Sequence, residues 1–222
     1  SLDGVYPVVL SQYWKEWLDP KVSNDVRIVP NPYRYGLSPT SFEKRDMNLL
    51  LMVGRPSHIK GHSLAINAVH ELRKEGENVV LQLAGTSKNN LPKNLRSKDG
   101  LIAKGWVGEK ELDVLINRAG FLLMPSEHEG MPLSLLDGLA TGLPAIVSDA
   151  CSPFINEGGI VIKERNVNAW KEGIRNQIHN RKEWEKRVLK APNDVEGLDP
   201  DADKSRWKNV YDEIIEIHSK ID

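Results

Sequence analysis

The chain has little cysteine, almost no net charge and no cluster of residues with metal-ligand spacing. Cys151 is the only cysteine among 222 residues, which excludes an internal disulfide, and no Cys/His group has the spacing of a zinc site. We therefore expect no metal site and a reducing, cytoplasmic compartment. Thirty Lys and Arg against 31 Asp and Glu give a net charge of −1. That balance lacks the positive surplus of a general nucleic-acid binder.

Long apolar runs and a leader pattern are also missing. No apolar stretch approaches the roughly 20 residues that span a bilayer, and the chain does not start with basic residues followed by an apolar core. It begins without Met and enters a strand pattern almost at once, so we expect a part of a longer protein. One segment leaves weak membrane contact open, at the inner face of a membrane. Residues 163–190 carry nine basic and four acidic side chains, which suits either anionic lipid or a solvated pair of helices.

Apolar runs that end at glycine alternate with helical patterns through the middle of the chain. This alternation is typical of a parallel sheet wrapped by helices. Strands are expected at residues 48–53, 79–83, 101–103, 121–124, 145–148 and 160–162, and helices at 63–74, 109–118 and 132–140. The sequence therefore predicts an α/β fold with a Rossmann-like parallel sheet of about six strands, flanked by helices.

The two ends differ from this middle. Residues 6–31 carry a strand-helix-strand pattern of their own, so we interpret residues 1–35 as the tail of a preceding domain and a hinge. Residues 36–190 form the Rossmann-like domain. Residues 194–222 carry nine acidic and four basic side chains, and we expect residues 191–222 to form an acidic C-terminal helix that packs back on the fold.

Two cations follow the first strand of the main domain. Gly54 and Arg55 leave the strand, and Lys60 precedes Gly61 where a helix begins. Ligands of open parallel sheets bind at the carboxyl ends of the strands, where helix N-termini present N–H groups to anions. Arg55 and Lys60 suit a phosphate or diphosphate at this position, although both are also plausible as solvated surface cations.

A longer motif follows the strand at residues 121–124. Glu129 and Gly130 fall in the loop, Pro132 suits a first helical turn, and Asp137 falls on the helix that follows. The two carboxylates suit pairs of sugar or ribose hydroxyls, while glycine permits close approach of a ligand. The alternative is that each acid merely caps or solvates the helix start.

Together these motifs resemble a known family. The patterns G-R-x-x-x-x-K-G and P-S-x-x-E-G-x-x-x-x-x-x-[ED]-x-x-A-x-G-x-P are similar to the donor-binding half of retaining GT-B glycosyltransferases, the group 1 family that includes glycogen synthases. The resemblance extends from Val26 to about Ile178. It implies that residues 36–190 bind a nucleotide-sugar donor and form the C-terminal half of a GT-B fold. Pro32 replaces the glycine that usually follows Asn31 in the hinge.

The resemblance implies roles for individual residues. Arg55 and Lys60 would hold the donor diphosphate and Glu129 the hydroxyls of the transferred sugar, which makes these three the catalytic group. Asp137 stands where the family has a second Glu that usually binds ribose. Trp106 and Val107 match the stretch that lines the nucleobase site, with core packing as the alternative for Trp106. The other implied donor-binding residues are Gly54, Gly130, Met131, Pro132 and Leu133.

The implied function is transfer of a sugar from a nucleotide-diphosphate sugar to a glycan, lipid or other acceptor with retention, as in polysaccharide biosynthesis. No cofactor or metal is implied. The acceptor would bind a missing N-terminal domain, so we expect this fragment to be inactive alone. A noncatalytic nucleotide-sugar-binding module, suggested by Asp137 and Pro32, stays open, and a nucleotide-sugar epimerase is less favoured because the second motif is foreign to it. The base, the sugar and the acceptor also stay open.

Overall fold

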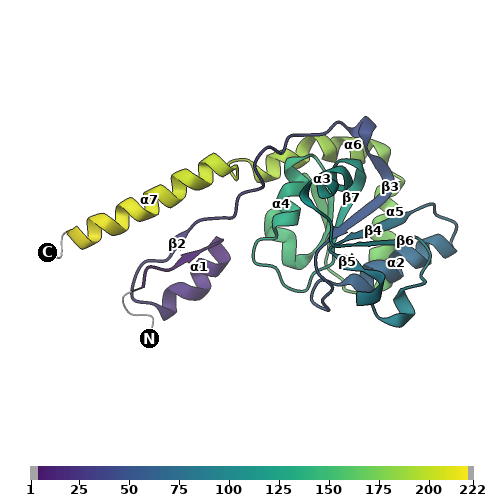
Figure 1. Ribbon diagram of the computed structural model, residues 1–222, viewed down its shortest axis with the longest axis horizontal. Helices are drawn as coiled ribbons and strands as arrows, with labels where there is room; N and C mark the ends of the chain where they lie inside the picture. Colours follow the sequence, from purple (N-terminus) through teal and green to yellow (C-terminus); the bar gives the residue numbers. More distant parts are fainter. Residues whose placement is uncertain (1–4, 220–222) are drawn as a thin grey trace. The chain divides into compact units, whose positions relative to one another are not determined.

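The computed structural model describes residues 5–219, which divide into two compact units. The larger unit comprises residues 37–129 and 134–195 (Figure 1). The smaller unit comprises the described parts of the two ends, residues 5–36 and 196–219, together with residues 130–133.

The larger unit is built on a seven-stranded sheet in the order β5-β6-β4-β3-β7-β8-β9. Its strands are β3 (Asp46–Val53), β4 (Val80–Ala84), β5 (Thr86–Ser87), β6 (Leu101–Gly105), β7 (Ala119–Met124), β8 (Ala145–Ser148) and β9 (Gly159–Ile162). All neighbours pair in parallel except β5, which is antiparallel to β6. The carboxyl ends of six parallel strands therefore meet at one edge of the sheet.

Helices cover both faces of this sheet because successive strand residues point to opposite sides. Leu50, Leu81 and Phe121 belong to one buried cluster with side chains from α2, α5 and α6. The alternate residue Leu122 lies against Gly138 of α4, on the other face. The helices are α2 (His62–Lys74), α3 (Glu109–Arg118), α4 (Leu133–Ala140), α5 (Val167–Ile178) and α6 (Arg181–Lys190), and the 3₁₀ helices are η2 (Phe42–Lys44), η3 (Lys88–Asn90), η4 (Lys93–Leu95), η5 (Asp149–Phe154) and η6 (Ala191–Val195).

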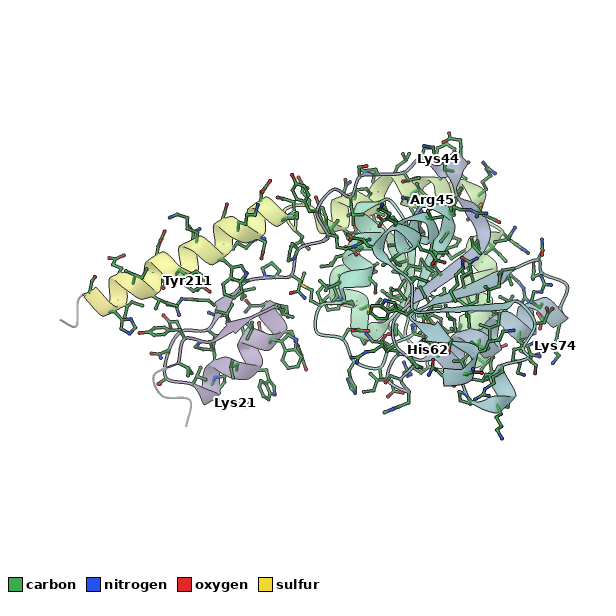
Figure 2. All side chains as sticks on the ribbon, viewed as in Figure 1. Lys21, Lys44, Arg45, His62, Lys74 and Tyr211 are labelled. Atoms are coloured by element: carbon green, nitrogen blue, oxygen red, sulfur yellow. The ribbon has the colours of Figure 1, made fainter. Side chains whose placement is uncertain are left out.

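Local signals account for several helix ends. The side chains of Asn166 and Asn180 accept backbone N–H groups at the starts of α5 and α6, at 2.9 and 3.2 Å. Gly76, with a φ of +95°, follows the end of α2. Arg45, labelled in Figure 2, is buried in the larger unit. It donates to the carbonyls of Ile116, Ala119 and Thr141, and burial lowers its pKa to about 10.

The smaller unit pairs the two ends of the chain. It contains β1 (Val8–Val9), α1 (Gln12–Leu18), η1 (Asp19–Lys21), β2 (Arg27–Ile28) and α7 (Pro200–Ser219), and β1 and β2 are parallel. Arg27 forms an ion pair of 2.7 Å with Glu213 of α7, and the rings of Tyr6 and His218 lie 5.5 Å apart. The acidic C-terminal helix therefore packs on the N-terminal segment.

The predicted α/β class and Rossmann-like sheet are confirmed. All six predicted strands are present, and the sheet has a seventh, β5, which the sequence analysis missed because it is two residues long. The helix predicted at residues 132–140 begins one residue later, at Leu133. None of the helices found between residues 5 and 219 is both long and apolar enough to cross a membrane.

Candidate functional site

The loop after β3 carries the two predicted cations. Gly54 ends the strand with a φ of +148°, a conformation that favours glycine, and Arg55 is exposed immediately after it. Lys60 lies in the turn before α2 and is partly buried. Gly61 has a φ of +73°, and a Cβ there would lie 2.3 Å from the carbonyl oxygen of Pro125. Glycine at 61 therefore lets this turn approach the loop that follows β7.

The loop after β7 is held by its own set of contacts. Glu127 N donates to Ile59 O at 2.7 Å, and Ser148 Oγ donates to Ser126 O at 2.5 Å. Arg165, three residues after the end of β9, donates to Pro125 O at 2.7 Å and to Glu127 Oε1 at 2.9 Å. Three strand ends thus fix the backbone that leads into Glu129.

Lys60 and Glu129 meet directly. Lys60 Nζ donates to Glu129 Oε1 at 2.7 Å, and the carboxylate side chain is only 7% exposed while the lysine side chain is 35% exposed. The pair joins the two sequence motifs across the carboxyl ends of β3 and β7. A cationic side chain and a carboxylate are therefore adjacent at this edge, and the lysine side chain remains partly open to solvent.

Cys151 lies near this pair, and its thiol is unreactive as a nucleophile. It is buried in η5, and burial, with the Glu129 carboxylate as a second cause, raises the pKa of its thiol to about 12. Since the thiolate is the nucleophilic form, Cys151 contributes packing and no nucleophile.

Trp106 follows β6 at the same edge of the sheet and is 85% exposed, so the alternative that it packs in the core is wrong. Val107 beside it is partly buried. The strand β5 ties this stretch to the Gly54 loop. Gly85 N donates to Gly105 O at 2.7 Å, and Thr86 Oγ1 donates to Gly54 O at 2.9 Å. Hydrogen bonds from Gly85 and Thr86 therefore link the segment that carries the exposed Trp106 ring to the loop predicted to bind the diphosphate.

Gly130, Met131, Pro132 and Leu133 belong to the smaller unit. There Asn31 Nδ2 donates to Met131 O at 3.1 Å, and the space beside Gly130 is bordered by Leu10 and Trp14. Met131 and Pro132 are buried, whereas Leu133 is 55% exposed at the first position of α4. The predicted hinge residue Asn31 thus fixes the backbone that precedes α4.

Asp137 lies one turn into α4 and is 4% exposed. The interpretation that it solvates a helix end is therefore wrong. A carboxylate this deep in the protein makes interactions within the protein as well as any with a ligand, so its distance from a ribose is set by packing.

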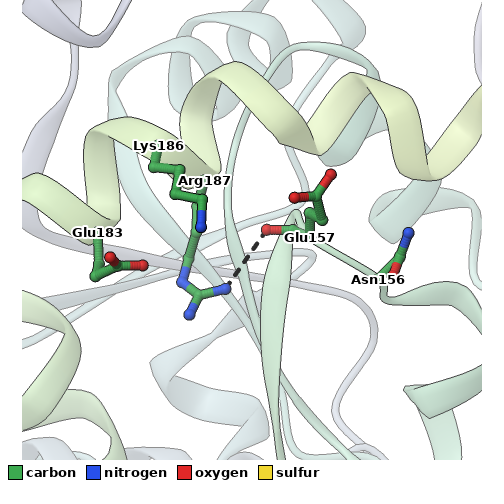
Figure 3. Close-up of a pocket in the computed structure, with 5 residues that line it drawn as sticks. All are labelled: Asn156, Glu157, Glu183, Lys186 and Arg187. Carbon is green, nitrogen blue, oxygen red and sulfur yellow. Dashed lines mark hydrogen bonds between the residues drawn. The ribbon is translucent and has the colours of Figure 1, made fainter.

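A cavity of about 170 Å³ lies away from these motifs, next to the segment that precedes β9. It is lined by Asn156, Glu157, Glu183, Lys186 and Arg187 (Figure 3). Arg187 donates to Gly159 O at 2.7 Å, and Asp194 accepts the backbone N–H groups of 156, 157 and 158 at 2.9–3.0 Å. The backbone N–H groups of residues 156–158 are thus satisfied by the protein itself.

The sequence analysis missed three residues of the candidate site: His62, Thr86 and Arg165. His62 and Thr86 are 5% and 0% exposed, and their polar atoms lie 3.1 Å apart. The sequence marks this pair only by position: His62 follows the Lys60-Gly61 turn before α2, and Thr86 follows Gly85 at the end of β4.

Comparisons with known proteins address the family directly. The family model described as "Glycosyl transferases group 1" matches residues 38–193. Among curated proteins, the chain is 27% identical over 129 residues to "Putative glycosyltransferase EpsF" of Bacillus subtilis (strain 168), a match covering 55% of this chain and 34% of EpsF. The chain spans less than half the length of the curated relatives it matches.

Solved structures support the fold. A structure of S. aureus TarM in complex with UDP has a TM-score of 0.79 at 18% identity, covering 92% of this chain and 43% of TarM. The sucrose-phosphate synthase from Thermosynechococcus elongatus has a TM-score of 0.78 at 19% identity, covering 95% of this chain and 58% of that protein. The α/β fold therefore matches that of GT-B glycosyltransferase structures.

Proposed function

The chain belongs to the group 1 family of glycosyltransferases, and we propose that it is the part of a retaining enzyme that binds the nucleotide-sugar donor. The donor would be a nucleotide-diphosphate sugar, and the sugar would pass to a glycan, lipid or other acceptor. The names of relatives such as "Amylovoran biosynthesis glycosyltransferase AmsK" favour a role in polysaccharide biosynthesis. We also propose that residues 36–190 are the donor-binding domain and that the acceptor binds elsewhere in the full-length protein.

The ion pair between Lys60 and Glu129 is the observation that carries this proposal. A nucleotide sugar has a dianionic diphosphate bonded to a ring rich in hydroxyl groups, so its binding site needs a cation and a hydroxyl acceptor side by side. Lys60 and Glu129 are separated by 2.7 Å and stand at the carboxyl ends of neighbouring strands. That edge is where open parallel sheets bind ligands.

The chemistry asks for stabilisation of a leaving group. When the bond between the anomeric carbon and the diphosphate breaks, negative charge grows on the diphosphate and positive charge on the sugar. Arg55 and Lys60 would neutralise the growing negative charge, and backbone N–H groups at the start of α4 would add to it. Loss of one such contact costs about 2–4 kcal/mol of transition-state stabilisation. We propose that these cations do the work without a metal ion.

Glu129 would orient the sugar and not attack it. Its carboxylate is 7% exposed and held by Lys60, so it would accept hydrogen bonds from the sugar hydroxyls at a fixed position. Trp106 would stack on the nucleobase and Asp137 would bind the ribose, directly or through water. The donor-binding set would be completed by Gly54, Val107, Gly130, Met131, Pro132 and Leu133.

The experiment is a thermal-shift panel on the 222-residue chain. Uridine, guanosine and adenosine diphosphates are compared with their glucose and N-acetylglucosamine esters, because a ligand that binds only the folded state raises the melting temperature. We expect the diphosphate of one nucleoside to raise the melting temperature. One of its sugar esters should raise the melting temperature further, because the sugar also contacts Glu129. A sugar ester that never exceeds its free diphosphate would favour a nucleotide-binding module, and a panel without any shift would refute donor binding. Sugar transfer itself is then measured on the full-length protein.

A further inference from the structure

His62 occupies a buried position beside the proposed diphosphate loop. It is the first residue of α2, follows Gly61 directly, and is 5% exposed (Figure 2). A buried imidazole carries two ring nitrogens that need partners, so its retention in the core calls for a structural reason.

The partner of His62 is a threonine at the end of the next strand. His62 Nε2 and Thr86 Oγ1 lie 3.1 Å apart, and Thr86 Oγ1 lies 2.9 Å from Gly54 O. A carbonyl only accepts, so the single hydroxyl proton of Thr86 points to Gly54. Thr86 Oγ1 is then left to accept a hydrogen bond from the Nε2–H of His62, and we assign the ring to the neutral tautomer protonated at Nε2 on this ground.

This chain of two hydrogen bonds closes a loop. Gly54 and His62 are the two ends of the segment that carries Arg55 and Lys60, and Thr86 binds both ends. The backbone reinforces the closure, since Gly54 N donates to Ala84 O at 2.9 Å. Gly85 has a φ of +88°, and a Cβ there would lie 2.9 Å from Gly54 O. The carbonyl of Gly54 is thus held by the Thr86 hydroxyl and lies close against Gly85.

The environment of His62 favours the neutral form of the ring. Burial is the largest effect and lowers its pKa, and the Lys60 ammonium lowers it further, while the backbone carbonyl groups of Ser57 and Gly54 act in the opposite direction. Nδ1 is buried and has no hydrogen-bond partner among the described residues. The ring therefore acts through its single Nε2–H donor.

We propose that His62 is a positioning residue that, through Thr86, holds the loop of residues 54–61 so that Arg55 and Lys60 face the donor diphosphate. This inference rests on the proposed function. It adds two residues to the site that make no contact with the donor and set the geometry of those that do. Because these hydrogen bonds already order the loop, the loop loses less conformational entropy when a diphosphate binds.

The test uses paired substitutions in the 222-residue chain. Thr86→Val keeps the shape of the side chain and removes the hydroxyl, while Thr86→Ser keeps the hydroxyl. His62→Leu removes the donor, while His62→Gln keeps an amide N–H at a similar reach. Calorimetry with the nucleoside diphosphate that binds best should show a 5- to 10-fold loss of affinity in Thr86→Val and His62→Leu, as expected for one hydrogen bond. Thr86→Ser and His62→Gln should bind within about twofold of wild type.

Two features separate positioning from a general loss of stability. The double variant His62→Leu/Thr86→Val should bind no more weakly than either single variant, because both residues act through one chain of hydrogen bonds. The matched control is Trp184→Phe, which removes a buried donor to Gly120 O at 2.9 Å in the same unit and should leave the affinity unchanged. Binding of the free nucleoside should also be unchanged in every variant.

The ring tautomer gives a second readout. Nitrogen-15 spectra of histidine-labelled protein should show His62 protonated at Nε2 and bare at Nδ1, and Thr86→Val should move the Nε2 signal. A ring protonated at Nδ1, or Thr86→Val with wild-type diphosphate affinity, would overturn the inference while donor binding stands. If His62→Leu fails to fold, the Thr86 pair decides alone. A wild-type chain that binds no diphosphate would overturn both this inference and the proposed function.

Discussion

Lys60 Nζ and Glu129 Oε1 are 2.7 Å apart although 69 residues separate them in the sequence. Each neutralises the other in the absence of a donor. In the proposed site a diphosphate that approaches Lys60 finds the side chain already held in place, and a sugar that approaches Glu129 finds the carboxylate group already oriented. The ion pair therefore prepares both halves of the proposed site before a ligand arrives.

The first prediction concerns the stability of this pair. Lys60→Met should lower the free energy of unfolding by about 1–3 kcal/mol, because it leaves the buried Glu129 carboxylate without its cation. Lys60→Met/Glu129→Gln should recover part of that loss. Urea denaturation measures both. The control is Lys74→Met, whose ion pair with Glu71 is exposed and should change stability by less than about 0.5 kcal/mol. Equal effects at Lys60 and Lys74 would show that the Glu129 charge is well solvated.

Trp106 is predicted to serve binding and not folding. At 85% exposure its ring buries little area, so Trp106→Ala should change the unfolding free energy by less than about 0.5 kcal/mol. Nucleoside diphosphate affinity should fall by about 1–3 kcal/mol, the usual contribution of one stacked base. Inorganic pyrophosphate, which has no base, should bind the variant and the wild type equally. A loss shared by pyrophosphate would argue against base stacking.

Asp137 is predicted to read ribose from a buried position. Asp137→Asn keeps the volume of the side chain and removes its charge. The variant should therefore bind a ribonucleoside diphosphate more weakly than the wild type, by about 1.5–3 kcal/mol. The 2′-deoxy or 3′-deoxy analogue should lose less, since one hydroxyl contact is already gone. Calorimetry with the three ligands makes the comparison. Asp137→Glu, the family's residue, should cost about 1–3 kcal/mol of stability because the site is closely packed around the shorter acid.

The contradictory result for Asp137 is also clear. A wild-type chain that binds the ribose form and both deoxy analogues with equal affinity would exclude ribose recognition by this carboxylate. It would favour the noncatalytic module.

His62 predicts how stability depends on pH. Its pKa in the folded protein is lower than the ordinary value of 6.5. Below pH 6.5 the histidine is therefore protonated to a greater extent in the unfolded chain than in the folded chain. Stability should therefore fall as pH drops from 6.5 toward the lower folded-state pKa. Urea denaturation at pH 7.5, 6.5, 5.5 and 5.0 should show a steeper loss in wild type than in His62→Gln. Parallel curves for the two proteins would contradict a depressed pKa at His62.

Sequence patterns predicted the scaffold better than the contacts. Apolar runs bounded by turn residues placed the six parallel strands of the larger sheet, because a strand such as β7 or β8, buried along its whole length, is recognisable without its neighbours. The motifs also placed Lys60 and Glu129 at adjacent strand ends, where they meet. The burial of Asp137 and the exposure of Trp106 depend on long-range packing, so local sequence left both undecided. The role of Thr86 could not be predicted from the sequence, because its hydroxyl contacts Gly54 and His62, which lie 32 and 24 residues away.

The position of the bound diphosphate tests the central claim most directly. Backbone amide spectra of the nitrogen-15-labelled chain, recorded during titration with the preferred nucleoside diphosphate, report where it binds. We predict the largest shifts in residues 54–61 and 105–108, with further shifts at 129–137, and much smaller shifts in the Lys60→Met variant at equal ligand concentration. Shifts that gather instead around Lys186 and Arg187, or that are unchanged in Lys60→Met, would contradict the assignment of the donor site to the edge where Lys60 meets Glu129.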